Sequence, residues 1–350
     1  MKVLVVSNMS AKKSAPLQGL FVDNQVKVLQ SKSNEIKYYK IKWNTDSLLC
    51  RLFKYPFFIL CFFWDIILQK EKYDIIHVHF YFPTIILVAL YKFLKDKNVK
   101  VVVTCHGSDI YSYDPPSYFY KRLSNIVNFW IFTSSELEKR YFRRVSNSKI
   151  LCAGYDDRLF NLNEASCSYI NKSYDFLQVG TLNNNKGLDR LLYLVEALPH
   201  CRFALVGHGP LENEVKIASK RFSNFHYLGS KSPEHLSNVI RKSKYLLSLS
   251  RNESFGLTIT EAHSCGVPCI ATMTDGSIAQ IKNSEQLVEQ DGVKEEKIKE
   301  NLKSLAQRMY LLNENEYLKL SHRVSSSTSQ YSLSYVTERL LSIYKNLRGS

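Results

Sequence analysis

Eight short runs of mostly apolar residues recur along the chain and limit its possible folds more than any other feature does. Within each run, apolar residues follow one another instead of alternating with polar ones. Strands have this composition when both faces of their sheet are covered, as in parallel sheets. We therefore predict eight strands, within residues 2–7, 74–80, 99–107, 129–134, 175–182, 201–209, 245–250 and 268–273.

Segments with helical spacing of their apolar residues lie between these runs, for example 188–198 and 234–243. Repeated strand–helix units indicate doubly wound α/β structure. The set of runs occurs twice, and the segment 156–173, rich in Asn, Ser and Asp, separates the two sets as a linker does. We predict two Rossmann-like domains, 1–155 and 156–324, facing each other across a cleft in which ligands bind.

The last part of the chain, residues 325–350, is predicted to be a hinge and a helix. A Ser-rich stretch occupies 325–332, and apolar residues then occur at 336, 340, 341, 344 and 347. This spacing predicts a helix over 335–347. We expect that helix to pack back on the first domain.

The charge of the chain points to anionic partners. The 47 Lys and Arg residues exceed the 32 Asp and Glu residues, which gives a net charge of +15. Residues 1–155 hold 23 basic and 11 acidic side chains, a net of +12, and the remainder holds 24 and 21, a net of +3. Phosphates, nucleic acid and acidic lipid heads are the partner classes that such a field attracts. A hydrophobic content of 45% argues against extensive disorder.

Several features predict a cytoplasmic protein that is soluble or peripheral to a membrane. Eight cysteines are scattered without a CxxC pair, which is typical of reduced thiols. The apolar start of the chain lacks the length and flanks of a signal peptide, and we interpret it as a first strand. The longest apolar segment, 55–68, is interrupted by Asp65 and is shorter than the roughly 20 residues of a membrane span.

The stretch ESFGLTITEAHSCGVPCIAT, residues 253–272, places two carboxylates eight positions apart. We predict a loop with Glu253, then a helix from near Gly256 to Gly266, with Glu261 about one turn in. The N–H groups around Gly256, Leu257 and Thr258 would suit a pyrophosphate. Each carboxylate can accept two O–H donors of a sugar. The alternative is an ordinary helix start with a solvated glutamate.

This stretch resembles the E-x7-E signature of glycosyltransferase family 4. It matches the form E-G-F-G-x4-E-A-x3-G-x-P-V at positions 253, 255, 256, 261, 262, 266 and 268. Segments 179–187, 204–212, 154–160 and 104–109 are similar to four further motifs of that family, in the same order. The resemblance implies a GT-B fold and a retaining transfer that needs no metal or other cofactor. It also implies a UDP- or GDP-linked sugar as donor, and a glycan or polyprenyl-linked saccharide as acceptor on the first domain.

The candidate site residues of the second domain follow from these motifs. We expect Lys186 to place its ammonium on the leaving diphosphate, Glu253 to hold the donor sugar and Glu261 to hold the ribose. The remaining expected donor-binding residues are Gly180, Thr181, Gly207, Gly209, Ser254, Phe255, Gly256, Leu257 and Thr258. The GxG of 207–209 is followed by Glu212 where a dinucleotide fingerprint needs a third glycine, which argues against a dehydrogenase.

The candidate residues of the first domain are fewer. By resemblance His106 contacts the donor sugar or positions the reacting groups, although a single histidine after a strand can also be structural. Gly19 resembles a loop glycine that lets backbone N–H groups approach phosphate. Asp109 either orients His106 or caps the next helix. His77 and His79 are either a metal pair or residues that line the core or the cleft.

Two departures from the family pattern affect the donor site. Thr181 stands where the family often has Arg, and Arg251 or a neighbour is the candidate replacement. The family turn G-G-x-P-E reads DGSIAQ at 275–280, which keeps Gly276 but lacks the acid.

The segment 48–68, flanked by Arg51 and Lys54, is either a helix packed on the first domain's sheet or a face that contacts an anionic membrane. The charge of +12 supports the second interpretation. Three other classes of function remain as alternatives: a GT-B sugar-nucleotide epimerase, a basic membrane- or RNA-binding protein without turnover, and a dehydrogenase. We expect no nucleic-acid partner, because RNA-binding modules present aromatic platforms, and an RNA-binding function would leave the aligned motifs unexplained.

Overall fold

A computed structural model describes residues 1–13, 15, 18–163, 169 and 172–349. The chain divides into two compact units, Met1–Gly154 with Leu333–Ser350, and Tyr155–Ser332. The first division falls one residue before the predicted boundary at 155. Residues 164–168, 170 and 171 of the predicted linker, with Cys167, lie outside the described residues.

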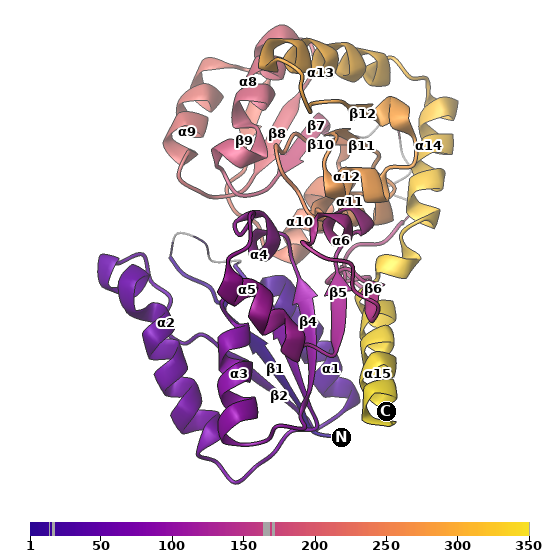
Figure 1. Cartoon of the computed structure of the whole chain (residues 1–350). Coiled ribbons are helices and arrows are strands. Elements are labelled where there is room, and N and C mark those ends of the chain that lie inside the picture. Colours follow the sequence, from indigo (N-terminus) through magenta and orange to yellow (C-terminus); the bar gives the residue numbers. More distant parts are fainter. Residues whose placement is uncertain (14, 16–17, 164–168, 170–171, 350) are drawn as a thin grey trace. The chain divides into compact units, whose positions relative to one another are not determined.

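The first unit is built on a six-stranded parallel sheet in the order β2-β1-β3-β4-β5-β6 (Figure 1). Its strands are β1 (Val3–Ser7), β2 (Ile36–Lys40), β3 (Ile75–His79), β4 (Lys100–Cys105), β5 (Phe129–Phe132) and β6 (Ser148–Ile150). Its α-helices are α1 (Leu20–Lys32), α2 (Leu48–Phe62), α3 (Ile85–Leu94), α4 (Ser108–Tyr111), α5 (Tyr118–Leu123), α6 (Ser135–Arg140) and α15 (Leu333–Gly349).

The second unit repeats this plan with a parallel sheet in the order β12-β11-β10-β7-β8-β9. Its strands are β7 (Tyr174–Val179), β8 (Phe203–Val206), β9 (Phe225–Tyr227), β10 (Ser243–Ser248), β11 (Cys269–Thr272) and β12 (Leu287–Val288). Its α-helices are α8 (Leu188–Ala197), α9 (Glu212–Arg221), α10 (Pro233–Arg241), α11 (Leu257–Ser264), α12 (Asp275–Gln280), α13 (Glu295–Tyr310) and α14 (Glu314–Ser326).

Both faces of the second sheet are covered, as the uninterrupted apolar runs predict. Phe176 of β7 belongs to one buried hydrophobic cluster and its neighbour Leu177 belongs to another. Successive side chains of a strand point to opposite faces, so the two clusters lie on the two sides of the sheet. The parallel, doubly covered architecture predicted from the sequence is therefore confirmed.

The C-terminal helix α15 belongs to the first unit and packs against α1, as predicted (Figure 1). The Tyr344 hydroxyl of α15 lies 2.5 Å from Nδ1 of His77 on β3. The predicted Ser-rich hinge begins later than expected, because Ser325 and Ser326 are still the last residues of α14.

Helix α2 packs on the first unit through one face, as the first interpretation of the 48–68 segment expects, and the contact with a membrane stays a prediction. Its buried residues are Cys50, Phe58 and Phe62, so one face packs on the unit. Its remaining surface exposes large apolar side chains, Leu48, Leu49, Leu52, Phe53, Phe57 and Leu60. Along the described residues, no helix is both long enough and apolar enough to cross a bilayer. The seven described cysteines all carry free thiols.

Candidate functional site

The site in the second unit forms where two loops leave adjacent strands at the same edge of the sheet. The loop after β7 carries Lys186, and the loop after β10 carries Glu253. Carboxyl ends of neighbouring parallel strands are where ligands bind in open α/β sheets. The Lys186 ammonium donates to Oε2 of Glu253 in a partly buried ion pair. Two residues that the sequence analysis selected 67 positions apart are thus brought into direct contact.

Asn185 holds these two loops together. Its carbonyl accepts from the Arg251 N–H at 2.7 Å, and its Oδ1 accepts from the Asn252 N–H at 3.0 Å. Its Nδ2 donates in return to the Asn252 carbonyl at 2.9 Å. Three hydrogen bonds from the residue before Lys186 therefore fix the loop that carries Glu253.

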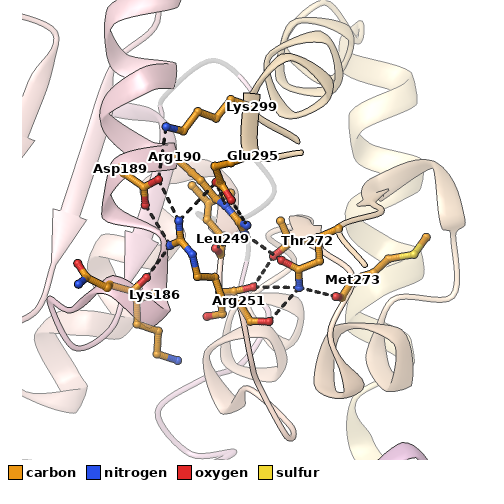
Figure 2. A network of polar contacts seen from close by, with 12 residues as sticks. Lys186, Asp189, Arg190, Leu249, Arg251, Thr272, Met273, Glu295 and Lys299 are labelled. Carbon is orange, nitrogen blue, oxygen red and sulfur yellow. Dashed lines mark hydrogen bonds and ion pairs between the residues drawn. The ribbon is translucent and has the colours of Figure 1, made fainter. Parts of the chain in front are cut away.

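A network of polar side chains holds the loop after β10, which carries Glu253 (Figure 2). Arg190 of α8, 2% exposed, donates through Nε and Nη2 to the Glu295 carboxylate at 2.6 and 2.9 Å. Its Nη1 donates to the Leu249 carbonyl at 3.1 Å and to Oε1 of Gln290 at 3.0 Å. Burying a guanidinium without partners costs free energy, because the charge loses its hydration. These hydrogen bonds to a carboxylate, a carbonyl and an amide oxygen offset that cost.

Gln290 extends the network to a second loop. Its Nε2 donates to the Arg251 carbonyl at 3.0 Å and to the Met273 carbonyl at 2.7 Å. The amide therefore joins the loop after β10 to the segment after β11.

Arg251 does not take the place of the family arginine at Thr181. Its guanidinium donates to both oxygens of Asp189 at 3.0 Å and to the Asn184 carbonyl at 2.6 Å. Figure 2 shows Arg251 turned toward Asp189, with the Lys186 ammonium pointing away from this network. Its observed contacts make it a support of the loops. The hypothesis that Arg251 replaces the missing family arginine is not supported by its position.

The predicted helix start is α11, which begins at Leu257 behind Gly256. Gly256 has φ 78° and precedes the helix as its N-cap. The N–H groups of Leu257 and Thr258, in the first turn, have no intrahelical acceptor, and Gly256 has no side chain that could accept from them. Such a helix end favours negative charge.

The backbone at Gly207, after β8, lies very close to the loop after β7. A Cβ added at Gly207 would lie 1.9 Å from the Gly180 carbonyl oxygen, so only glycine fits there.

Glu261 lies half-buried on α11, one turn beyond the helix start. Burial raises the pKa of its carboxyl to about 7. Desolvation disfavours the charged form of an acid, and donors on a bound ligand would restore it. Hydroxyl groups of a ligand that donate to Glu261 would therefore favour its ionised form.

Gln280 is a site residue that the sequence analysis missed. The turn 275–280 lacks the family acid, and the structure places the Gln280 amide beside the loop that leads from β10 to α11. Its Nε2 donates to the carbonyls of Phe255 and Gly256, and its Oε1 accepts from the Thr260 hydroxyl at 2.5 Å. An acid could accept from Thr260 but could not donate to the two carbonyls when ionised. Phe255 itself is buried and packs on the Tyr331 ring at 5.3 Å.

The other predicted donor residues lie on three loops that follow strands of the same sheet. Gly180 and Thr181 follow β7, Gly207 and Gly209 follow β8, and Ser254 lies between Glu253 and Phe255. The roles given to these residues remain predictions.

The predicted residues of the first unit gather at the carboxyl edge of its own sheet. His106 follows β4, and its Nε2 lies 3.0 Å from Nδ1 of His79. Burial lowers the pKa of His106, which keeps its ring neutral. Gly19, with φ 83°, precedes α1.

Asp109 holds backbone around His106. Its carboxylate accepts from the N–H groups of Tyr81, His106 and Gly107 at 2.8 to 3.0 Å. The observed contacts therefore fix the backbone of the loop before α4, and they include the main chain of His106 but not its ring.

His77 is a core residue and not one of a metal pair. Its ring contacts the Tyr344 and Thr104 hydroxyls at 2.5 and 2.7 Å. Within the described ranges, no group of three or more His, Cys, Asp or Glu side chains could hold a metal ion.

Two family profiles match the sequence. The profile described as "Glycosyl transferases group 1" matches residues 168–325, and "Glycosyltransferase Family 4" matches residues 32–150. The first covers the loops with Lys186, Glu253 and Glu261, and the second covers His106 and Asp109.

Several curated relatives are similar to this chain. MJ1178 of Methanocaldococcus jannaschii, an uncharacterized glycosyltransferase, is 28% identical over 217 residues, which are 60% of this chain and 59% of the relative. N-acetyl-alpha-D-glucosaminyl L-malate synthase of Bacillus anthracis is 28% identical over 59% of this chain and 58% of the relative. An uncharacterized 41.2 kDa protein in the cps region of Klebsiella pneumoniae is 26% identical over 58% and 61%. The chain thus spans about three fifths of the length of these curated relatives.

Solved structures share the fold over nearly the whole chain. Anabaena Alr3699/HepE in complex with UDP and glucose superposes with a TM-score of 0.71 over 99% of this chain and 100% of that one, at 15% identity. Sucrose-phosphate synthase of Thermosynechococcus elongatus superposes with a TM-score of 0.77 over 99% of both chains, also at 15% identity. With the two parallel six-stranded sheets, these likenesses confirm the predicted GT-B fold.

Proposed function

We propose that this chain, which belongs to the family 4 type of glycosyltransferases, transfers a sugar from a UDP- or GDP-linked donor to a glycan or lipid-linked acceptor. The transfer retains the anomeric configuration and uses no metal ion. The observation that carries the proposal is the contact between Lys186 and Glu253 beside the start of α11. A cation, two carboxylates and the N–H groups of a helix start are the groups that a sugar diphosphate needs, and they lie on two adjacent loops and on α11 of one unit.

The chemistry follows from the charges that these groups carry. Cleavage of the bond between sugar and diphosphate builds negative charge on the leaving phosphate oxygens. Lys186 and the N–H groups of Leu257 and Thr258 stabilise that charge, which is electrostatic catalysis aimed at the transition state. Glu261 accepts from the ribose hydroxyls, and Glu253 accepts from hydroxyls of the donor sugar.

The ion pair between Lys186 and Glu253 gives the site a defined resting state. Without a ligand, each group neutralises the other in a half-buried position, which limits the desolvation cost of both. A bound donor offers phosphate to the lysine and hydroxyls to the glutamate. Donor binding therefore replaces one ion pair with two sets of charge-assisted hydrogen bonds.

The test is a screen of nucleotide sugars followed by product analysis. A true donor raises the melting temperature by binding linkage, and UDP- or GDP-linked sugars are expected to do so. Incubation with acceptor should then yield a glycosylated product and free nucleotide diphosphate. Release of the diphosphate without any transferred sugar would instead favour the epimerase. Failure of every nucleotide sugar to bind would contradict the proposal.

We propose bacterial surface polysaccharide synthesis as the setting of this activity. The Klebsiella relative, described as a protein in the cps region, supports this setting. Polysaccharide extracted from a strain that lacks the gene should have truncated or missing repeat units. Unchanged polysaccharide composition in that strain would contradict the assignment.

We further propose that the enzyme works in the cytoplasm at an anionic membrane surface, which it contacts through α2. Leu52 and Phe53 are 63% and 52% exposed, and the net charge of +12 on residues 1–155 complements acidic lipid heads. Burial of one such side chain contributes about 1.5–3 kcal/mol.

Vesicle sedimentation tests this contact. The paired change Leu52→Ser and Phe53→Ser should weaken binding to phosphatidylglycerol vesicles at least tenfold. Ile217→Ser, which removes an apolar side chain that is 69% exposed on α9 of the other unit, is the control and should leave binding unchanged. Equal sedimentation of the wild type with neutral vesicles, or no effect of the paired change, would rule the contact out.

A further inference from the structure

Three histidine rings lie next to one another at the carboxyl edge of the first unit's sheet. His77 and His79 lie on the same face of β3, and His106 follows the adjacent strand β4. The ring centres of His77 and His79 are 4.5 Å apart, and those of His79 and His106 are 5.3 Å apart. His77 uses both ring nitrogens within the core, through Tyr344 and Thr104. His79 contacts neither of these hydroxyls and pairs with His106 instead.

The ring of His79 is fully buried and makes a single side-chain hydrogen bond among the described residues. Its Nδ1 lies 3.0 Å from Nε2 of His106, whereas its own Nε2 is buried without a partner. A buried polar atom without a partner costs free energy, because it has lost its hydrogen bonds to water. Packing alone therefore does not explain a histidine at position 79, where an apolar ring would avoid that cost.

Both rings of this pair are neutral, which limits where the proton between them can lie. Burial lowers the pKa of His79 to about 3, and burial together with the nearby His79 lowers the pKa of His106. A neutral imidazole has one N–H and one lone pair. With the proton on its Nδ1, His79 donates to His106, and only a lone pair stays unpaired. With the proton on Nε2, His79 would bury an N–H without an acceptor, a defect that folded proteins rarely contain.

Three neighbours hold His106 in place for this hydrogen bond. The ring centres of Phe21 and Phe80 lie 5.0 and 4.5 Å from that of His106, and Asp109 accepts from its backbone N–H at 3.0 Å. Phe80 has a positive φ of 66°, which is rare for a side chain of this size. Strained backbone of this kind is concentrated at functional sites, where the surroundings fix it. Both the main chain and the ring of His106 are therefore fixed.

We propose that His79 is a positioning residue, which donates its Nδ1–H to Nε2 of His106 and thereby fixes the proton of His106 on Nδ1. The lone pair of His106 is then occupied by His79, so His106 has an N–H donor to offer and no free base. His106 is the partly exposed ring of the pair and lies at the edge where ligands bind in such sheets. The effect of His79 on turnover rests on the proposed function, whereas its effect on the proton of His106 does not.

The first experiment locates the proton by nitrogen NMR of the full chain, without turnover. The signals of His106 are assigned by their loss in His106→Gln. In the wild type, Nδ1 of His106 should have the chemical shift of a protonated nitrogen and Nε2 that of an unprotonated one. His79→Phe keeps an aromatic ring without an N–H and should abolish this single tautomer. His79→Asn, whose amide N–H takes the place of Nδ1–H, should preserve it. A proton on Nε2 of His106 in the wild type, or an unchanged tautomer in His79→Phe, would overturn the proposal.

The second experiment measures sugar transfer by the same variants. His79→Phe should lower kcat at least tenfold, as expected for the loss of one oriented hydrogen bond, and His79→Asn should retain most of the wild-type kcat. His77→Phe, which removes two hydrogen bonds from the neighbouring core ring, is the control for damage to the core. It should lower the melting temperature and leave kcat and the tautomer of His106 unchanged. Equal losses of kcat in His79→Asn and His79→Phe would overturn the positioning role. If the wild type transfers no sugar, the proposed function fails, while the wild-type NMR signals still decide where the proton lies.

Discussion

Replacing Glu261 by Gln should make the protein more stable and a poorer binder of its donor. Burial raises the pKa of this carboxyl from its usual 4.5 to about 7. The folded state therefore holds the proton more tightly than the unfolded state. Wild-type stability falls as pH rises from about 4.5 to about 7 and stays lowered above that range. Glutamine has nearly the same shape and no proton to lose, so the variant avoids this loss.

The size of the effect follows from the two pKa values. The gain of Glu261→Gln over wild type should be about 1 kcal/mol at pH 5 and approach about 3 kcal/mol at pH 8. Partial exposure of the Glu261 side chain makes both stability gains smaller, but the gain at pH 8 stays larger than the gain at pH 5. Over pH 6 to 8 the ionised fraction of Glu261 rises from about a tenth to about nine tenths, so wild-type donor affinity should rise roughly tenfold.

Urea titrations at pH 5 and pH 8 measure the stability difference. The three tryptophans, Trp43, Trp64 and Trp130, all lie in the first unit, so circular dichroism is the better probe of the second. Glu214→Gln, which removes an exposed carboxylate from α9, is the control and should show no such gain. A gain that is equal at both pH values, or donor affinity that does not change with pH, would refute the reasoning.

Four further substitutions, in three tests, probe the loops that carry Lys186 and Glu253 and the polar network that supports them. Lys186→Ala should lower turnover at least tenfold, about 1.4 kcal/mol in barrier, in a steady-state assay at saturating donor; wild-type turnover would exclude its role. Gly187→Ala and Gly292→Ala share a positive φ, 67° and 73°, but only the first puts a Cβ 2.2 Å from the Leu249 carbonyl oxygen. Denaturant titration should therefore show a loss of about 1–2 kcal/mol for Gly292→Ala and a clearly larger one for Gly187→Ala, and equal losses would contradict the clash. Gln290→Ala should cost about 1–3 kcal/mol in the same titration, because buried carbonyls lose their donor, and an unchanged midpoint would show that the network is not needed.

The interior of both sheets could be predicted from the sequence, whereas their edges could not. The eight predicted runs correspond to the eight interior strands, and the four strands that were missed, β2, β6, β9 and β12, are the outermost ones. An interior strand is buried on both faces and reads as a continuous apolar run. An edge strand is short or half-exposed, as in Ile36–Lys40 and Ser148–Ile150, and its composition resembles that of a loop.

The sequence also singled out the charged residues of the proposed donor site, but not the residues that hold them in place. Lys186, Glu253 and Glu261 lie in motifs that are local in sequence. Arg190 and Gln290 contact each other across 100 positions, and no spacing rule signals such a pair. The sequence did contain one indication that Arg190 is buried. It falls four residues before Leu194, on the buried face of α8, and a charged residue in such a place needs a partner.

The central claim is that the loops after β7 and β10 and the start of α11 hold a nucleotide diphosphate. A crystal structure of the chain soaked with UDP or GDP tests it most directly. The account predicts phosphate oxygens on Lys186 and on the N–H groups of Leu257 and Thr258, with a ribose hydroxyl on Glu261. A nucleotide bound elsewhere in the second unit, with the ion pair between Lys186 and Glu253 intact, would contradict it.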